Sequence, residues 1–561
     1  MKNREDIFRL RTAFTFIFLA LIFIAIFVRL IFVQVVDRPR YLSELLPQFD
    51  YGYDILNAER GEIFDRNGVV AAYDIVSYQL DLNPSLMSEE EHERLLENLP
   101  GILNIKKEKV EQILKVDHYL MVDASISEDQ KLKIEEIGIR NGITLTKKSE
   151  RVYPFGEVLA PVIGFTGTEG KGLAGIEFSF NSELEGKKGR VFYNISSTKP
   201  LTPGKPSYEV EAEKGGSVTL TLDSNIQYEV QKMLINTIKK TEAKAGVVIV
   251  VDVKTGEILA MVNYPSFDPY SPTTSFTSLN RAVYWNYEPG SILKPIVAAA
   301  ALSEGTLNSS DEFYCPGTIK VRDRIISCWQ THGKEKGLNE IMKDSCDVSF
   351  VTIGLNLGKE KMLDNFKRFG FGRGTGIELP GEESGIVPSP SSIGDVEVAT
   401  MSFGQGIAVT PLQLATALCA IGNDGIEMKP SIIKEVKDSD GQVVYSFKPV
   451  IKQAVVSEKV AETVLESMRA VVSKDGVYQA IIDGYSIAGK TGTAQKLQPG
   501  KGYSKDKLIY SFFGLVPGND PEVGVLVVVD ETPNPTYSLN ITAPLFREIA
   551  LYLIKYLRIQ P

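Results

Sequence analysis

The longest apolar run of the sequence lies near its N-terminus. Residues 13–28 carry no charge and are nearly all apolar, and residues 30–36 continue the run after Arg29. As a helix, residues 13–33 extend about 31 Å, which matches the hydrocarbon core of a bilayer. The first twelve residues are polar and basic. We therefore expect a cytoplasmic tail at 1–12 and a transmembrane signal anchor at 13–36. A cleaved signal peptide fits less well, because the run is long and no small-x-small cleavage site follows it.

The pattern from residue 37 to about 215 is that of short strands and small helices. Residues 41–53 are expected to form a stalk, and Asn67-Gly68 predicts a turn before an alternating strand at 69–82. Ser88-x-x-Glu91 and Ser127-x-x-Gln130 are capping boxes, and each begins a charged amphipathic helix. These elements predict an α+β module.

From residue 216 the pattern changes to Val- and Ile-rich strands and apolar helices, which are typical of a larger core. The predicted strands are 217–222, 245–253, 257–263, 508–516 and 522–530, and the predicted helices are 225–241, 296–302, 337–368, 411–421 and one from about 543. The fold class expected for the whole chain is therefore α+β, with one N-terminal transmembrane helix.

One predicted helix carries candidate chemistry at its start. A Pro-Gly pair breaks the backbone before Ser291, and an apolar run follows Lys294. This spacing places both side chains on the same face of the helix. A serine hydroxyl becomes a good nucleophile when a base takes its proton, and a lysine amine in a dry site can do so. By itself the pair is common, and a helix cap followed by a surface lysine would explain it equally well.

Two further motifs follow in order along the chain. Ser345-Cys-Asp347 lies in an expected helical run before residues 348–350, and Lys490-Thr491-Gly492-Thr493 follows a strand-like stretch at 485–488. Ser345 could pass a proton to a leaving amine. Lys490 and the hydroxyls of Thr491 and Thr493 could hold a terminal carboxylate. Backbone N–H groups of Ser291 and Thr493 could form an oxyanion hole, since Gly492 lets the strand edge approach closely.

This trio is typical of penicillin-binding proteins and class A β-lactamases, and the chain resembles the class B penicillin-binding proteins over roughly residues 12–550. Segments 60–68 and 175–177 look like the family's pedestal motifs, and segments 280–291 and 402–413 are similar to its nucleophile region and cleft lining. The sequence of residues 402–413 is more similar to the septal, division-type branch of the family than to the elongation branch.

The resemblance implies a peptidoglycan D,D-transpeptidase that needs no cofactor and no metal. Ser291 would be acylated by the D-Ala-D-Ala end of one stem peptide, and an amine of a second stem would resolve the acyl-enzyme. Residues 37–215 would be the pedestal, or dimerisation, domain. Residues 216–561 would be the transpeptidase domain, an antiparallel sheet flanked by helices. The implied partners are stem peptides, β-lactam antibiotics, the cytoplasmic membrane, a SEDS-type glycosyltransferase and division proteins.

The middle motif departs from the family, which usually has Ser-x-Asn where this chain ends in Asp347. An amide both donates and accepts hydrogen bonds, whereas a carboxylate only accepts them. An ionised Asp347 near Lys294 would also favour the ammonium form of that lysine and oppose its role as a base. Either Asp347 is protonated, or the site balances its charges through Lys490 as well.

Composition narrows the alternatives. The chain has 61 Lys and Arg against 71 Asp and Glu, and the basic excess near the N-terminus leaves the remainder acidic, which argues against nucleic-acid binding. Only three histidines occur, too few for a histidine-rich metal site. Cys315 and Cys328 could form a disulfide or remain free thiols, and Cys346 and Cys419 are expected to be buried thiols.

Two other functions remain open at this point. A serine carboxypeptidase or β-lactamase would use the same trio, although Glu360 has the wrong spacing for the deacylating glutamate of a class A lactamase. A catalytically weak scaffold that recruits division proteins is the other alternative, and Asp347 is its only support.

Overall fold

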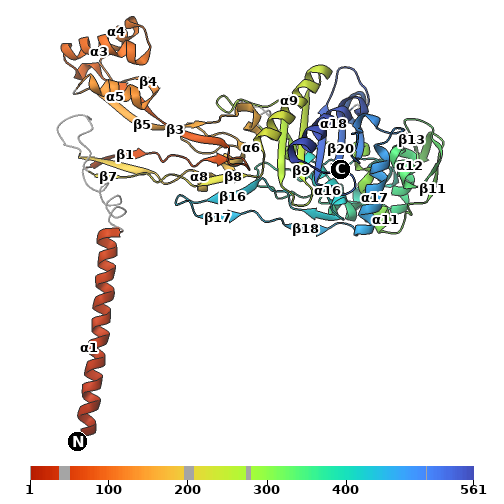
Figure 1. The fold of residues 1–561 in the computed structure, drawn as a ribbon, viewed down its shortest axis with the longest axis horizontal. Helices are drawn as coiled ribbons and strands as arrows, with labels where there is room; N and C mark the ends of the chain where they lie inside the picture. Colours follow the sequence, from red (N-terminus) through yellow and green to blue (C-terminus); the bar gives the residue numbers. More distant parts are fainter. Residues whose placement is uncertain are drawn as a thin grey trace. The chain divides into compact units, whose positions relative to one another are not determined.

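The computed structural model describes residues 2–36, 51–139, 141–194, 208–272, 279–498, 500 and 502–561. The chain forms two compact units. The smaller unit comprises residues 1–59, 75–150 and 186–215, and the larger comprises residues 60–74, 151–185 and 216–561. Figure 1 shows the elements of both. Residues 41–50 of the predicted stalk lie outside the described residues, whereas Tyr51–Leu56 form strand β1.

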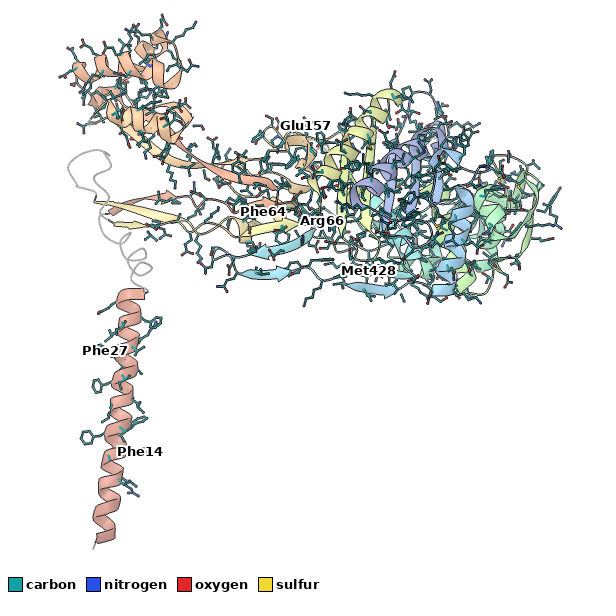
Figure 2. All side chains as sticks on the ribbon, viewed as in Figure 1. Phe14, Phe27, Phe64, Arg66, Glu157 and Met428 are labelled. Carbon is teal, nitrogen blue, oxygen red and sulfur yellow. The ribbon has the colours of Figure 1, made fainter. Side chains whose placement is uncertain are left out.

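The smaller unit begins with the long helix α1, Lys2–Ile31, which a π-helical turn continues over Phe32–Val36. Ala13–Gln34 is long and apolar enough to cross a membrane. Phe14 and Phe27 project outward from it and are 74% and 65% exposed (Figure 2). Such a continuous exposed apolar surface is what a membrane-spanning helix presents to lipid.

The rest of the smaller unit is an α+β module. Its helices are α3 (Glu89–Leu103), α4 (Lys107–Leu114) and α5 (Glu128–Glu136). Ser88 and Ser127 cap α3 and α5 through reciprocal bonds with Glu91 and Gln130, so both predicted capping boxes are confirmed. The strands of this unit are β1, β6 (Gly189–Asn194), β7 (Tyr208–Val210), β4 (Leu120–Ile126), most of β5 (Ile143–Val152) and the second half of β3 (Val70–Leu82).

The segments that resemble pedestal motifs meet in the larger unit through buried charges. Arg60 Nε lies 2.5 Å from Glu177 Oε2, and Arg151 Nε lies 2.7 Å from Glu177 Oε1. Arg151 also contacts Asp74 at 3.0 Å. Glu177 has no exposed side-chain surface. Because ions are costly to bury unless they are paired, these residues hold their segments in one arrangement.

The core of the larger unit is an antiparallel sheet with the order β10-β9-β21-β20-β19. Its strands are β9 (Ala245–Asp252), β10 (Ile258–Tyr264), β19 (Ala488–Gln498), β20 (Gly502–Val516) and β21 (Val523–Asp530). Four of these strands coincide with predicted ones. Their Val and Ile side chains are buried on both faces, which is why the sequence pattern was clear.

Helices cover both faces of this sheet (Figure 1). A Cβ at Gly514 would meet Phe546 of α18 (Ser538–Leu557), whereas the neighbouring Leu515 lies against Gly422 of α16 (Pro411–Gly422). Since adjacent strand residues point to opposite faces, the two helices lie on opposite sides of the sheet. Helix α9 (Ser224–Thr241) packs beside α18, and α11 (Lys294–Ser303) and α17 (Glu458–Val471) pack beside α16.

Helix α18 begins at Ser538, five residues before the predicted start. The prediction followed the apolar residues that begin at Ala543, but the helix starts with a turn in which polar residues alternate with apolar ones. Thr542 Oγ1 donates to Ser538 O at 3.0 Å. The predicted helical region 337–368 contains α12 (Gly337–Lys343), α13 (Asp347–Leu357) and α14 (Lys359–Arg368).

The remaining elements of the larger unit are short. Its helices are α6 (Ala160–Ile163), α7 (Gly175–Ser179), α8 (Asn181–Leu184), α10 (Arg281–Tyr284) and α15 (Asp395–Met401). Its strands are β2 (Ile63–Phe64), β8 (Ser217–Leu220), β11 (Glu312–Cys315), β12 (Thr318–Val321), β13 (Arg324–Ser327), β14 (Gly333–Lys336), β15 (Ile426–Met428), β16 (Ile433–Lys437), β17 (Val443–Ser446) and β18 (Ile451–Ala454).

Candidate active site

Ser291 lies in a tight turn at the start of the predicted buried helix. The 3-10 turn η6 spans Gly290–Leu293 and leads directly into α11. Gly290 has φ +67°, and a Cβ at Gly404 would lie 2.1 Å from Gly290 O. The turn and the segment 402–413 can approach this closely only because residue 404 is glycine, while Gly290 adopts the left-handed conformation of the turn.

The amine of Lys294 is directed at the second motif. Its Nζ donates to Ser345 O at 2.6 Å, to Asp347 Oδ1 at 2.7 Å and to Ser345 Oγ at 3.2 Å. Lys294 is completely buried, and Asp347 keeps 22% of its side-chain exposure. Three acceptors around one amine fit an ammonium, which has three N–H donors and no acceptor. Within the described part of the chain, no hydrogen bond joins this amine to Ser291 Oγ.

Ser345 was predicted to lie inside a helix, and this prediction is wrong. It lies in the turn between α12 and α13 with φ +51°, and Cys346 is the N-cap of α13. The left-handed backbone interrupts the helical hydrogen bonds, so the Ser345 carbonyl is available to Lys294. The strained turn therefore presents both oxygens of Ser345 to the buried lysine.

Lys490, on β19, is the second fully buried lysine of the site. Its Nζ donates to Ser345 Oγ at 2.9 Å and to Thr491 O at 3.3 Å. Burial and the charge of Lys294 hold the pKa of Lys490 well below its usual range, and Asp347 acts in the opposite direction. The Ser345 hydroxyl thus bridges two amines, and one carboxylate, Asp347, lies beside them.

The edge of β19 lies against the Ser291 turn because residue 492 is glycine. A Cβ at Gly492 would lie 3.0 Å from both Ile292 Cβ and Pro289 O, and closer still to Ser511. Thr491 and Thr493 are partly exposed on either side of it. Thr493 Oγ1 lies 2.7 Å from Ser538 Oγ, and Ser538 also donates to Gly492 O. Sequence analysis missed Ser538, which belongs to no motif.

Sequence analysis also missed Glu288 and Tyr503. Glu288 Oε1 accepts hydrogen bonds from Gly406 N and Tyr503 Oη, each at 3.0 Å. Desolvation raises the pKa of Glu288. The carboxyl thus ties the nucleophile turn to the segment 402–413 and to β20. The only signal for it in the sequence is its position just before the Pro-Gly break.

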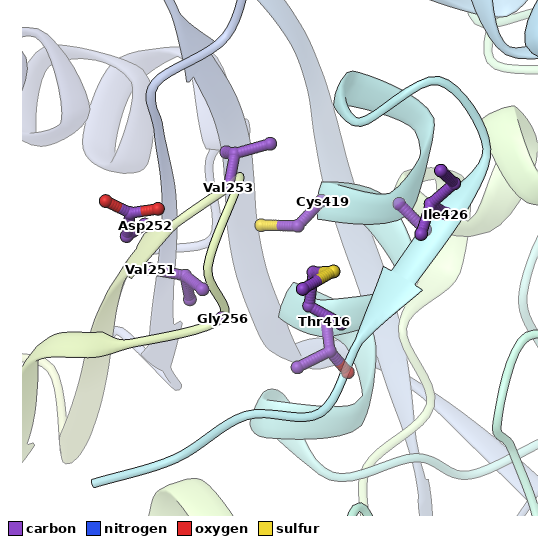
Figure 3. A pocket seen from close by; sticks show the side chains of 9 residues that line it. Val251, Asp252, Val253, Gly256, Thr416, Cys419 and Ile426 are labelled. Atoms are coloured by element: carbon purple, nitrogen blue, oxygen red, sulfur yellow. The ribbon is translucent and has the colours of Figure 1, made fainter. Parts of the chain in front are cut away.

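Two other features lie outside this constellation. All four cysteines are free thiols, so the disulfide considered for Cys315 and Cys328 is not formed. Cys346 and Cys419 are buried, as predicted. A small, mostly apolar pocket between β9, α16 and β15 is lined by residues such as Val251, Thr416 and Cys419 (Figure 3). None of the candidate site residues lines it.

Comparison with known proteins gives the family. The transpeptidase domain of penicillin-binding proteins matches residues 246–551, and their dimerisation domain matches residues 55–220. The chain belongs to the class B penicillin-binding proteins, as the sequence motifs predicted.

Several relatives are similar over most of their length. Stage V sporulation protein D of Bacillus subtilis is 34% identical over 99% of this chain and 86% of that protein. Peptidoglycan D,D-transpeptidase FtsI of Escherichia coli is 33% identical over 75% of this chain and 69% of that protein. Among solved structures, penicillin-binding protein 3 of Mycobacterium tuberculosis in complex with aztreonam has a TM-score of 0.70 at 27% identity, over 90% of this chain and 98% of that one.

Proposed function

We propose that this chain is a membrane-anchored peptidoglycan D,D-transpeptidase that cross-links stem peptides through an acyl-enzyme on Ser291. The observation that carries the proposal is the convergence of two buried lysines, Lys294 and Lys490, on Ser345 Oγ beside the Ser291 turn. Family membership and the relatives named D,D-transpeptidases support the same reaction.

Each site residue then has a role. Ser291 attacks the carbonyl of the penultimate D-Ala, and Lys294 accepts its proton. Lys490 with Thr491 and Thr493 holds the terminal carboxylate. The N–H groups of Ser291 and Thr493 stabilise the oxyanion, because Gly492 lets the strand lie against the turn. The Ser345 hydroxyl passes a proton to the departing D-Ala amine.

The charge balance suggests how Lys294 becomes a base. In the described arrangement Lys294 Nζ donates to Asp347 Oδ1, while the pKa of Lys490 is lowered. A substrate carboxylate beside Lys490 favours the charged form of that amine. Ser345 Oγ lies 3.2 Å from Lys294 Nζ and 2.9 Å from Lys490 Nζ, so it can carry a proton from the first amine to the second. Substrate binding would thereby leave Lys294 neutral, so that its amine can accept the hydroxyl proton of Ser291.

The same proposal covers the rest of the chain. Residues 13–36 anchor it in the cytoplasmic membrane with residues 1–12 inside, residues 37–215 form the pedestal, and residues 216–561 form the outward-facing transpeptidase domain. Glycan polymerisation then falls to a SEDS-type partner. The sequence of residues 402–413 favours a role in cell division, with division proteins as further partners. Wall synthesis during sporulation is the second candidate process, because of the similarity to stage V sporulation protein D.

Labelling with a fluorescent penicillin separates the three possible functions. The full-length chain in detergent is incubated with the drug, and the bound label is followed over hours. Stable labelling that Ser291→Ala abolishes, and that the exposed control Ser389→Ala retains, is the expected result. Rapid loss of the label would identify a β-lactamase. An unlabelled chain would identify a scaffold and overturn the proposal.

A further inference from the structure

Three cysteines and a histidine gather beside the active-site turn, and the function proposed above uses none of them. They are Cys315 at the end of β11, Cys328 after β13, His332 before β14, and Cys346 at the start of α13. We propose that these four residues bind one zinc ion and that this ion fixes the position of the Ser345 turn.

The geometry is that of a tetrahedral site. One ligand atom from each of the four residues lies within 4.8 Å of all the others. Cys328 Sγ lies 4.0 Å from Cys346 Sγ and 3.7 Å from His332 Nδ1. In a tetrahedral zinc site, with Zn–S of about 2.3 Å and Zn–N of about 2.0 Å, neighbouring ligand atoms are about 3.5–3.8 Å apart. The ligand atoms would have to approach one another by at most about 1 Å to complete the coordination.

The surroundings suit bound thiolates. Cys315 and Cys346 are completely buried. Asp347 N lies 3.3 Å from Cys328 Sγ, and both N and Oγ of Ser349 donate to Cys346 Sγ, at 3.5 and 3.2 Å. Such N–H and O–H donors to sulfur are the usual outer shell of a metal site. A set of three thiolates and one imidazole selects zinc over harder cations.

His332 gives an independent indication. Its Nε2 is buried, and within the described part of the chain it has no hydrogen-bond partner, while its Nδ1 faces the Cys328 sulfur. A buried polar atom without a partner is costly. Zinc bound at Nδ1 would leave the ring proton on Nε2, and the free energy of the metal–nitrogen bond would offset the cost of that buried N–H.

The part of the fold around the cluster has only a small apolar core of its own. Residues 312–336 form two two-stranded sheets, β11–β14 and β12–β13, whose side chains are largely exposed. Two small apolar clusters lie here: Cys315, Cys346 and Val348, and, beside them, Val321, Val351 and Ala399. So small an apolar core stabilises little, whereas a structural zinc site contributes folding free energy directly.

The position of the cluster links it to the active site. Cys346 directly follows Ser345, and the Asp347 amide contacts Cys328 Sγ. Both Ser345 and Asp347 hold Lys294. A zinc ion bound here would fix the left-handed turn that presents Ser345 to both lysines. The cluster is therefore a positioning device and takes no part in bond making.

A disulfide between Cys328 and Cys346 is the rival explanation, since their sulfurs are 4.0 Å apart. It would leave Cys315 and His332 without a role at the same point. The two explanations differ in metal content and in the number of titratable thiols.

The test measures metal and thiols in the full-length chain, purified in detergent under reducing conditions. We expect elemental mass spectrometry to find about one zinc ion per chain. With cobalt in place of zinc, we expect the intense visible bands of a tetrahedral thiolate site. Cys328→Ser and His332→Ala should each weaken zinc binding at least tenfold, whereas Cys419→Ser, a buried cysteine outside the cluster, should retain the zinc. Absence of zinc and of cobalt bands in the reduced chain would overturn the inference, and so would a Cys328–Cys346 disulfide in the chain as isolated.

A second readout separates this inference from the proposed function. Removing zinc with a chelator should slow acylation by fluorescent penicillin at least tenfold, and adding zinc back should restore the rate. A chain that binds zinc but is never acylated contradicts only the proposed function. A chain that is acylated at the same rate with and without stoichiometric zinc contradicts the positioning role, and one that contains no zinc contradicts the site itself.

Discussion

Replacing Asp347 by asparagine removes the one carboxylate that the structure places on Lys294, at 2.7 Å. The substitution keeps the size of the side chain and its acceptor oxygen. The attraction between unit charges at this distance is about 1.5 kcal/mol at a dielectric constant of ~80 and about 6 kcal/mol at ~20. Because Asp347 is 22% exposed, solvent screens the pair, and we use the lower figure. Asp347→Asn should therefore favour neutral Lys294 by about tenfold.

The assay is the second-order rate of acylation by a fluorescent penicillin near neutral pH. If loss of the ammonium limits attack by Ser291, Asp347→Asn should be acylated faster than the parent, by up to about tenfold. Asp344→Asn, which removes a partly exposed carboxylate three residues away, should have no effect. A tenfold fall in the rate would refute the reasoning. It would show that the carboxylate takes part in acylation and does not restrain the base.

Four further predictions follow from the buried charged groups. Lys294→Ala should abolish labelling by penicillin but leave the thermal unfolding transition cooperative, because the lysine takes part in the reaction and is not needed for packing. Loss of the cooperative transition would contradict this. Burial lowers the pKa of Lys490, so carboxylate capture should weaken as pH rises through that lowered pKa, well below 10.5. Lys490→Arg stays charged and cannot take the proton from Lys294, so it should lose this alkaline limb and be acylated at least tenfold more slowly near neutral pH; an unchanged rate and limb would contradict the assignment. Through the same interval the unfolded chain binds more protons, so stability should rise with pH. Glu177→Gln should lower the free energy of unfolding by about 3–5 kcal/mol in chemical denaturation, because Arg60 and Arg151 lose the carboxylate that they share and only Arg151 keeps another, Asp74. The exposed Glu213→Gln should not change it, and a loss below about 1 kcal/mol would refute the argument.

The sequence predicted the parts of the site that depend on local spacing. Ser291 and Lys294 are one helical turn apart, and the motifs at 345 and 490 belong to a recurring trio, so their convergence could be expected. The Ser345 turn could not, because a left-handed conformation is uncommon for serine and the carbonyl that it presents is bonded by Lys294, which is far away in sequence. Glu288 and Tyr503, which are far apart in sequence, meet only through the packing of η6 against β20.

The fold, like the site, has elements that could be predicted from the sequence and elements that could not. Strands β9, β10, β20 and β21 were predictable because they are buried on both faces and rich in Val and Ile. The first turn of α18 was not, since Ser538 and Thr542 are polar and their helical role is set by contacts with β19 and within the turn. From the sequence, Cys315 and Cys328 were considered as a pair and Cys346 as a buried thiol, and only the tertiary structure brings these cysteines and His332 together.

The central claim is that Ser291 is the nucleophile. Mass spectrometry of the digested chain after reaction with benzylpenicillin tests it most directly, because the drug remains covalently bound to the residue that attacked it. The account predicts one adduct, on the peptide containing Ser291, which is absent from Ser291→Ala. An adduct on Ser345 or Ser349, with Ser291 unmodified, would contradict it.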